Sequence, residues 1–256
     1  MPATCHQLPY ERNIDLIAAE GPRVLDALEG ADISAQVPTC PEWNVAKLVD
    51  HLGAIHRWAA RIVELLSQER VRGRDVPDAQ PASDDERARW FGDGIELLAT
   101  TLKGADPDAP VWAWGADQHV AFWARRQLHE TTIHRADLEI TVGREPTIDT
   151  EIAVDGIDEF LDNLDHAASF APNVNQLRGE GERICLAATD AGVAWTIDLL
   201  EDRFGWRHSD EQSGVRVEGP AGDLVLFVYG RVAPGEAVAV TGDADLLERW
   251  RKNSSI

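Results

Sequence analysis

Positive charge is scarce in this chain. Its 256 residues hold 24 lysines and arginines against 45 aspartates and glutamates, which gives a formal net charge of −21. A protein with this charge repels the phosphates of nucleic acids and the anionic surfaces of membranes. The sequence also contains no basic run, so we expect no nucleic-acid partner.

Long apolar runs are absent as well. No segment reaches the roughly 18 consecutive apolar residues that a membrane helix needs, so we expect no association with a membrane. The first residues, MPATCHQLPYERN, have neither the basic start nor the apolar core of a signal peptide. These absences predict a cytoplasmic protein. The basic residues are nearly all arginine, a usage typical of GC-rich genomes such as those of many actinobacteria.

Cysteine is also rare. The three cysteines, Cys5, Cys40 and Cys185, are far apart in the sequence and form no CxxC pair. This pattern argues against a disulfide framework and against a zinc ribbon. We expect each cysteine to be a small buried apolar residue rather than a nucleophile.

The first half of the chain shows the periodicity of helices. Apolar residues recur at helical spacing over four segments, at about 10–28, 45–68, 83–102 and 118–142. Asn44 suits the N-cap of the second segment. Ser83 followed by Glu86 is a capping-box pattern at the start of the third. Four long helices joined by loops predict a four-helix bundle.

The second half mixes strand and helix patterns. Alternating apolar and polar residues predict two strands within 183–200, joined at Asp190-Ala191-Gly192, and further strands at 214–219 and 237–242. Helical patterns cover 152–168, 220–231 and 243–253. The segment GREPTID, 143–149, is the best linker candidate. We therefore expect two domains, 1–145 and 146–256, of which the second is a small α+β domain.

The segment ARRQLHETTIHRADLE, 124–139, suggests a metal site with unusual spacing. Because a helix turns about 100° per residue, His129 and His134 point roughly 140° apart and do not readily bind one ion. Glu130 and His134 are four residues apart and share one face, so they form a workable two-ligand arm. An exposed pair of polar side chains on the helix surface is the simpler interpretation.

A catalytic zinc site typically has three protein ligands, so a third must come from another helix. His51 lies in the apolar stripe of the second helix and is expected to face the bundle interior, where an unpaired imidazole is unfavourable. A hydrogen-bonded core histidine is the alternative. The remaining histidines fit less well by position, namely His6, His56, His119, His166 and His208.

Three motifs carry a resemblance to a known family. VPTCPEWNVAKLVDHLGAIHRW resembles the pattern P-x-CPGW-x-V-x-DLVAHL, and WARRQLHETTIHRADLE resembles RR-x-HE-x-x-x-HR-x-D. VEGPAGDLVLFVYGR and VTGDADLLERW resemble the C-terminal part of the same family. On these motifs the chain resembles the mycothiol-dependent maleylpyruvate isomerase family of the DinB-like metalloenzyme superfamily. It departs from the pattern at Glu42, where the family often has glycine.

The resemblance implies an N-terminal DinB-like four-helix bundle and a C-terminal sterol-carrier-like α+β domain that closes the active-site cleft. It implies Zn²⁺, or another divalent metal, bound by His51, Glu130 and His134. Arg231 would bind an anionic substrate or the carboxylate of the thiol, although a surface arginine at a helix end is an equal alternative.

Further residues around the metal are assigned less firmly by the resemblance. Asp137 and Arg126 would orient the ligands, or would form a charge pair along the helix. His129 is present in the motif but is not a family ligand, so we expect it to pack or to form a hydrogen bond.

The implied chemistry is that of a thiol cosubstrate. The metal would lower the pKa of the mycothiol thiol, and the thiolate would attack a small electrophile. The outcome is cis–trans isomerisation of a maleylpyruvate-type substrate, or S-transfer. A hydrolase with zinc-bound water and a non-catalytic small-molecule-binding protein are the alternatives. A monomer or a homodimer is expected.

Overall fold

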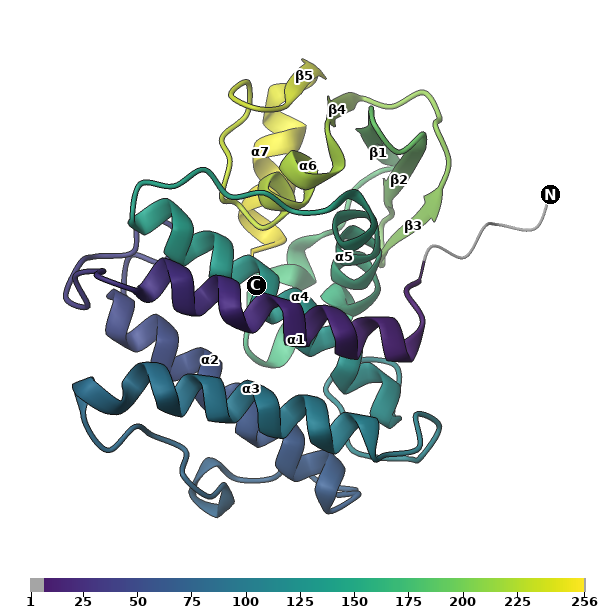
Figure 1. Ribbon diagram of the computed structural model, residues 1–256. Coiled ribbons are helices and arrows are strands. Elements are labelled where there is room, and N and C mark those ends of the chain that lie inside the picture. Colours follow the sequence, from purple (N-terminus) through teal and green to yellow (C-terminus); the bar gives the residue numbers. More distant parts are fainter. Residues whose placement is uncertain (1–6, 256) are drawn as a thin grey trace. The chain divides into compact units, whose positions relative to one another are not determined.

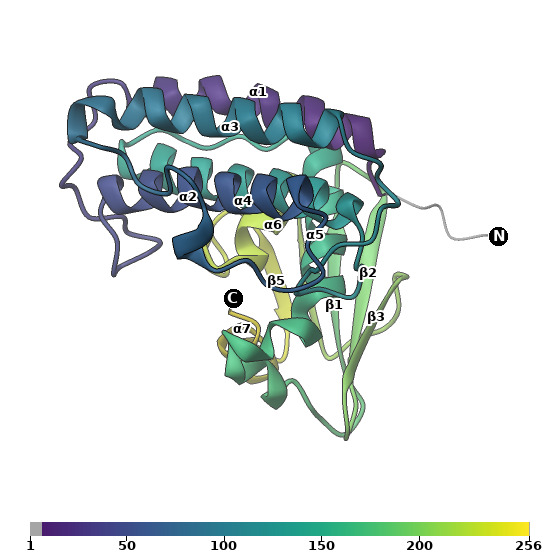
Figure 2. The same cartoon turned by 90° about the horizontal axis from the view of Figure 1, so that it is seen from below.

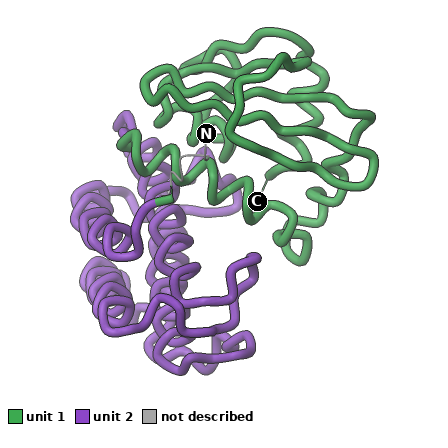
Figure 3. Tube along the Cα trace, turned by 90° about the vertical axis from the view of Figure 1, so that its right-hand side faces the viewer, with its two compact units in different colours: residues 1–7, 148–256 green, residues 8–147 purple. Residues whose placement is uncertain are grey.

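The computed structural model describes residues 7–255 and divides the chain into two compact units (Figure 3). Leu8–Thr147 forms the helical unit, and the described residues from 148 onward belong to the sheet unit. The predictions for Cys5 and His6 lie outside the described residues. Within residues 7–255, none of the helices combines the length and the apolar character that crossing a membrane requires.

The helical unit contains the four long helices that the periodicity predicts (Figure 1). They are α1 (Tyr10–Leu28), α2 (Val45–Glu64), α3 (Arg87–Lys103) and α4 (Val120–Thr141). Figure 2 shows α1 beside α3 in one layer and α2 beside α4 in the other. The closest packing joins α2 to α3 and α1 to α4 across the layers, so each helix contacts two others.

The starts of two helices test the capping predictions. Asn44 is confirmed as the N-cap of α2, because its Oδ1 accepts a hydrogen bond from the Lys47 amide at 2.9 Å. The prediction of a capping box at Ser83 is wrong. Asp84–Glu86 winds as a 3₁₀ turn, η2, and the Glu86 amide donates to the Ser83 carbonyl oxygen instead of its side chain. The α-helix α3 therefore begins only at Arg87.

A buried ion-pair network joins α4 to α1. The Arg135 side chain is fully buried and bonds to the carboxylates of Glu20 and Glu139. A third bond runs from its Nη2 to the Thr147 carbonyl oxygen at 3.0 Å. A guanidinium with three such partners is stable in the interior, whereas a carboxylate left without it is not. Arg135 thus fixes the position of α4, which carries most of the candidate site residues.

Glycine permits the close approach of α2 to α3. A Cβ at Gly53 would lie 2.2 Å from Cζ3 of Trp90, a distance that no real side chain tolerates. The Arg57 guanidinium lies over the same indole, 4.3 Å from the ring centroid, and donates to the Trp90 carbonyl oxygen at 2.6 Å. Gly53 therefore lets the α3 indole pack against the α2 backbone.

The sheet unit has five strands in the order β3-β2-β1-β4-β5. The strands are β1 (Glu182–Ala188), β2 (Val193–Leu199), β3 (Phe204–His208), β4 (Val215–Gly219) and β5 (Ala239–Gly242). Only β1 and β4 pair in parallel, while the other neighbours are antiparallel. Strand β3 was not predicted, because it is a five-residue edge strand too short to show a clear alternation.

Three helices complete this unit: α5 (Thr150–Asn163), α6 (Ala221–Val228) and α7 (Ala244–Asn253). Besides η2, three further 3₁₀ segments are η1 (Gly73–Asp75), η3 (Leu164–Ser169) and η4 (Pro172–Gln176). Helix α6 packs on α5 and contacts β1 and β4. The side chains of Ile184, Leu186 and Val217, on these two strands, are fully buried. The chain therefore combines a helical N-terminal part with a C-terminal α+β part, as the sequence predicts.

Candidate metal centre

Three side chains from α2 and α4 meet at one point. Glu130 Oε1 lies 2.9 Å from His51 Nε2 and 3.4 Å from His134 Nε2. One ligand atom of each residue lies within 4.8 Å of the other two. Tetrahedral zinc with bonds of roughly 2.0–2.1 Å places its ligand atoms about 3.3 Å apart. The spacing of these three atoms therefore suits one small divalent cation.

The spacing along α4 explains why two of these residues face the same point. Arg126, Glu130 and His134 follow one another at four-residue intervals and form a row along one face of the helix. Arg126 Nη2 donates to Glu130 Oε2 at 2.6 Å, which leaves Oε1 toward the histidines. His134 Nδ1 bonds to Asp137 Oδ2 at 2.8 Å, which leaves Nε2 toward Glu130. Neighbouring side chains thus hold Oε2 of Glu130 and Nδ1 of His134, the atoms that point away from the shared centre.

The electrostatics of the centre favour an ionised carboxylate beside a protonated imidazole. Burial alone would raise the pKa of Glu130, but the charge of Arg126 and hydrogen bonds from His134 and His51 outweigh it and hold that pKa well below 4.5. Burial would lower the pKa of His134, but bonds to Asp137, Cys40 and Glu130 raise it well above 6.5. An ionised carboxylate is one of the ligands that a divalent cation requires, and a bound cation would replace the proton between His134 and Glu130.

The loop before α2 contributes two side chains that sequence reasoning did not assign. The Trp43 ring centroid lies 4.7 Å from that of His51 and 5.4 Å from that of His134. Cys40 Sγ lies 3.6 Å from Asp137 Oδ2. The expectation that Cys40 is a buried apolar residue is therefore wrong, since it is partly exposed and bonds to a carboxylate. For Cys185 the expectation of burial is confirmed.

His51 lies at the edge of the core and not inside it, because 31% of its side chain is exposed. The interior imidazole of α2 is that of His56, which is fully buried. The Thr131 hydroxyl donates to the Gln127 carbonyl oxygen, so it accepts the proton of His56 Nε2 at 2.9 Å. Among residues 7–255, Nδ1 of His56 finds no hydrogen-bond partner, and burial lowers the pKa of this imidazole to about 3.

The other predicted residues lie outside this group. His129 is on α4 and is 2% exposed, in agreement with a packing role. Arg231 belongs to the sheet unit, where α6 ends in a Schellman motif. Gly230 adopts a φ of +77°, and the Arg231 amide donates to the Leu226 carbonyl oxygen at 2.8 Å. The backbone thus fixes the point from which the Arg231 side chain extends. Its binding of an anionic substrate or of the thiol's carboxylate stays a prediction.

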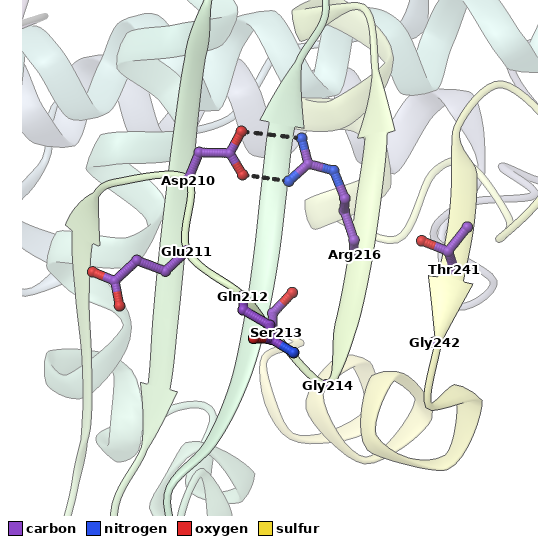
Figure 4. Close-up of a pocket in the computed structure, with 8 residues that line it drawn as sticks. All are labelled: Asp210, Glu211, Gln212, Ser213, Gly214, Arg216, Thr241 and Gly242. Atoms are coloured by element: carbon purple, nitrogen blue, oxygen red, sulfur yellow. Dashed lines mark hydrogen bonds and ion pairs between the residues drawn. The ribbon is translucent and has the colours of Figure 1, made fainter.

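A surface pocket of about 360 Å³ in the sheet unit contains none of the predicted site residues (Figure 4). It lies between the loop 210–214, Arg216 of β4 and Thr241 of β5. Arg216 pairs with Asp210 at 2.5 Å and with Glu218 at 2.8 Å. The charge of Arg216 is therefore already compensated by two carboxylates.

Comparison with known proteins agrees with the two-part structure. Residues 14–139 match the model of the mycothiol maleylpyruvate isomerase N-terminal domain, and residues 151–249 match the model of the C-terminal domain of the same family. No curated protein matches the chain.

Two solved structures resemble it in fold. The crystal structure of the mycothiol-dependent maleylpyruvate isomerase is 15% identical, with 93% of this chain and 95% of that chain covered and a TM-score of 0.64. A variant of that enzyme with one histidine replaced by alanine is 14% identical, with the same coverage and TM-score.

Proposed function

Because the chain belongs to the mycothiol-dependent maleylpyruvate isomerase family, we propose that it is a metal-dependent enzyme that uses mycothiol as a thiol cosubstrate. Its substrate is a small electrophile, and the reaction is cis–trans isomerisation of a maleylpyruvate-type compound or S-transfer. The observation that carries the proposal is the meeting of His51, Glu130 and His134 at distances that suit one divalent cation.

In this proposal His51 Nε2, Glu130 Oε1 and His134 Nε2 hold Zn²⁺ or another divalent metal. When bound, the metal is a Lewis acid that lowers the pKa of a coordinated thiol, so that a thiolate exists at neutral pH. Glu130 would contribute one negative charge to the bound cation and the two imidazoles none, so the site would keep a net positive charge that favours a thiolate. Arg126 holds the second oxygen of Glu130 and so favours binding through one oxygen. Asp137 holds the proton of His134 on Nδ1.

The isomerisation balances without any further reactant. The thiolate sulfur adds to one carbon of the cis double bond, and the electron pair moves to the adjacent carbonyl group. Rotation about the resulting single bond follows, and elimination re-forms the double bond in the trans configuration and returns the thiolate. In S-transfer the same thiolate displaces a leaving group and stays bound to carbon. None of the protein's own cysteines takes part in either reaction.

The sheet unit has two roles in the proposal. It is a sterol-carrier-like domain that closes the cleft of a DinB-like bundle, and its Arg231 binds a carboxylate of the electrophile or of the thiol. A guanidinium suits this task because it can donate two parallel hydrogen bonds to one carboxylate. We propose a cytoplasmic monomer or homodimer.

The test is turnover with and without the thiol. Metal-loaded protein is incubated with mycothiol and, in separate reactions, maleylpyruvate, an epoxide and an alkyl halide, and products are identified by mass spectrometry. We expect a trans isomer of unchanged mass, or a conjugate that contains mycothiol. Hydrolysis products formed equally well without mycothiol would replace the proposal with a metal-dependent hydrolase, and binding without turnover would replace it with a binding protein.

A further inference from the structure

The loop from Val37 to Asn44 reaches the metal centre through the side chains of Trp43 and Cys40, and it has a defined backbone. The Val37 amide donates to the Trp43 carbonyl oxygen at 3.0 Å, and the Trp43 amide donates to the Cys40 carbonyl oxygen at 2.8 Å. Gln36 Nε2 donates to the Pro41 carbonyl oxygen at 2.7 Å. These bonds close the loop on itself, so the positions of its side chains are set by its own backbone.

The Trp43 indole contacts the rings of both candidate histidine ligands. Its centroid distances of 4.7 Å to His51 and 5.4 Å to His134 are those of direct ring packing. A bond at Nε2 holds one atom of an imidazole but defines the tilt of the ring plane only loosely, and within the part of the chain that the structure describes His51 has no bond at Nδ1 comparable to that of His134 with Asp137. An indole packed against both rings limits the tilt of each ring.

Cys40 acts on the same centre through a carboxylate. The Asp137 side chain is fully buried, and its Oδ2 accepts the His134 Nδ1 proton at 2.8 Å. Cys40 Sγ lies 3.6 Å from the same oxygen, within reach of a weak S–H hydrogen bond. A buried carboxylate needs donors to hold its orientation. The thiol is therefore a second anchor for the group that sets which nitrogen of His134 carries the proton.

We propose that the loop Val37–Asn44 is a positioning element of the metal centre, in which Trp43 fixes the planes of His51 and His134 and Cys40 fixes Asp137. The inference rests on the proposed metal-dependent function. It assigns a role to two side chains of the CPEW segment, Trp43 beside the two histidine ligands and Cys40 beside Asp137, and it treats neither as a ligand itself.

The experiment uses the full chain and Co²⁺, whose visible absorption reports the number and arrangement of its ligands. Dissociation constants come from competition with a chelator. Because partners outside the ligand set typically contribute 10- to 100-fold to metal affinity, we expect Trp43→Leu and Cys40→Ala each to weaken binding by about 10-fold or more. Both variants should also change the cobalt spectrum. A variant that only destabilised the fold away from the metal centre would leave the spectrum of the bound cobalt unchanged.

Conservative variants and matched controls complete the design. Trp43→Phe retains an aromatic face and Cys40→Ser retains a donor, so both should recover most of the affinity. Trp206→Leu and Cys185→Ala remove the same side-chain types from the sheet unit and should leave cobalt binding unchanged. If Trp43→Leu does not fold, as judged by circular dichroism, Cys40→Ala decides the test, because removing one partly exposed sulfur leaves the core intact.

Two outcomes would overturn the inference, and they can be told apart. Wild-type affinity and an unchanged spectrum in Trp43→Leu and Cys40→Ala would remove the loop from the metal centre and leave the proposed function standing. Failure of the wild-type protein to bind cobalt would overturn the proposed metal centre and the inference together.

Discussion

His56 is expected to make the folded protein sensitive to acid. The imidazole is fully buried, its Nδ1 has no partner in the described part of the chain, and the pKa of the side chain is lowered from 6.5 to about 3. Between these two pH values the unfolded chain binds a proton on this side chain and the folded chain does not, so stability falls as the pH falls from about 6.5 toward 3. Replacing His56 with leucine removes this contribution and leaves the other titrating groups in place.

The size of the effect follows from the unfolded state alone, as long as the pKa in the folded protein lies well below 5. Protonation of a histidine with a pKa of 6.5 stabilises the unfolded chain by about 0.2 kcal/mol at pH 7 and by about 2 kcal/mol at pH 5. The wild-type protein should therefore lose about 2 kcal/mol more than His56→Leu between these two pH values.

The assay is urea denaturation of both proteins at pH 7 and pH 5, with a chelator present so that no metal binding adds its own pH dependence. For each protein, the change in the free energy of unfolding between pH 7 and pH 5 is measured. The change in His56→Leu is then subtracted from the change in the wild-type protein. An equal loss in the wild-type protein and in His56→Leu would refute the argument that His56 is buried and neutral.

Three further predictions concern packing and substrate binding. Arg135→Met leaves Glu20 and Glu139 buried without their cation, and it should lower the unfolding free energy by about 3–5 kcal/mol in urea denaturation; a loss below about 1 kcal/mol would contradict the buried network. Gly53→Ala should lower the free energy of unfolding by roughly 1–3 kcal/mol although alanine is the better helix former, because the new Cβ would meet the Trp90 indole. The control Gly92→Ala, whose Cβ would find only an ordinary 3.7 Å contact, should be neutral or stabilising in the same assay; similar losses in both would contradict the close approach. Arg231→Ala should leave the metal content unchanged and raise KM for mycothiol or for the electrophile, and unchanged kinetics would make Arg231 a surface residue.

The helices were predictable from the sequence because their apolar residues recur over many turns, and α1 begins and ends where the periodicity does. The arm formed by Glu130 and His134 was predictable for the same reason, since a four-residue spacing on a helix fixes which side chains share a face. The second helix was harder. Buried positions cover a wide arc of α2, so a stripe of apolar residues does not reveal that His56 is inside and His51 is at the edge.

What could not be predicted depends on tertiary contacts. Trp43 and Cys40 stand in a loop, where no periodicity indicates which side chain turns toward the metal centre. The cap at Ser83 fails because its own carbonyl oxygen takes the Glu86 amide, a choice that the residue pattern does not encode. Strand β3 exists because β2 offers it a partner along its whole length, while its own sequence carries a weak signal.

Metal content per chain tests the central claim most directly. Wild-type protein, loaded with zinc, dialysed and measured by elemental analysis, should hold one metal ion per chain, and so should His129→Ala, which removes a neighbouring imidazole of the same helix. His51→Ala, Glu130→Gln and His134→Ala should each lose the ion while remaining folded by circular dichroism. Full zinc content in any of these three variants would contradict a centre in which one residue of α2 and two of α4 share one cation.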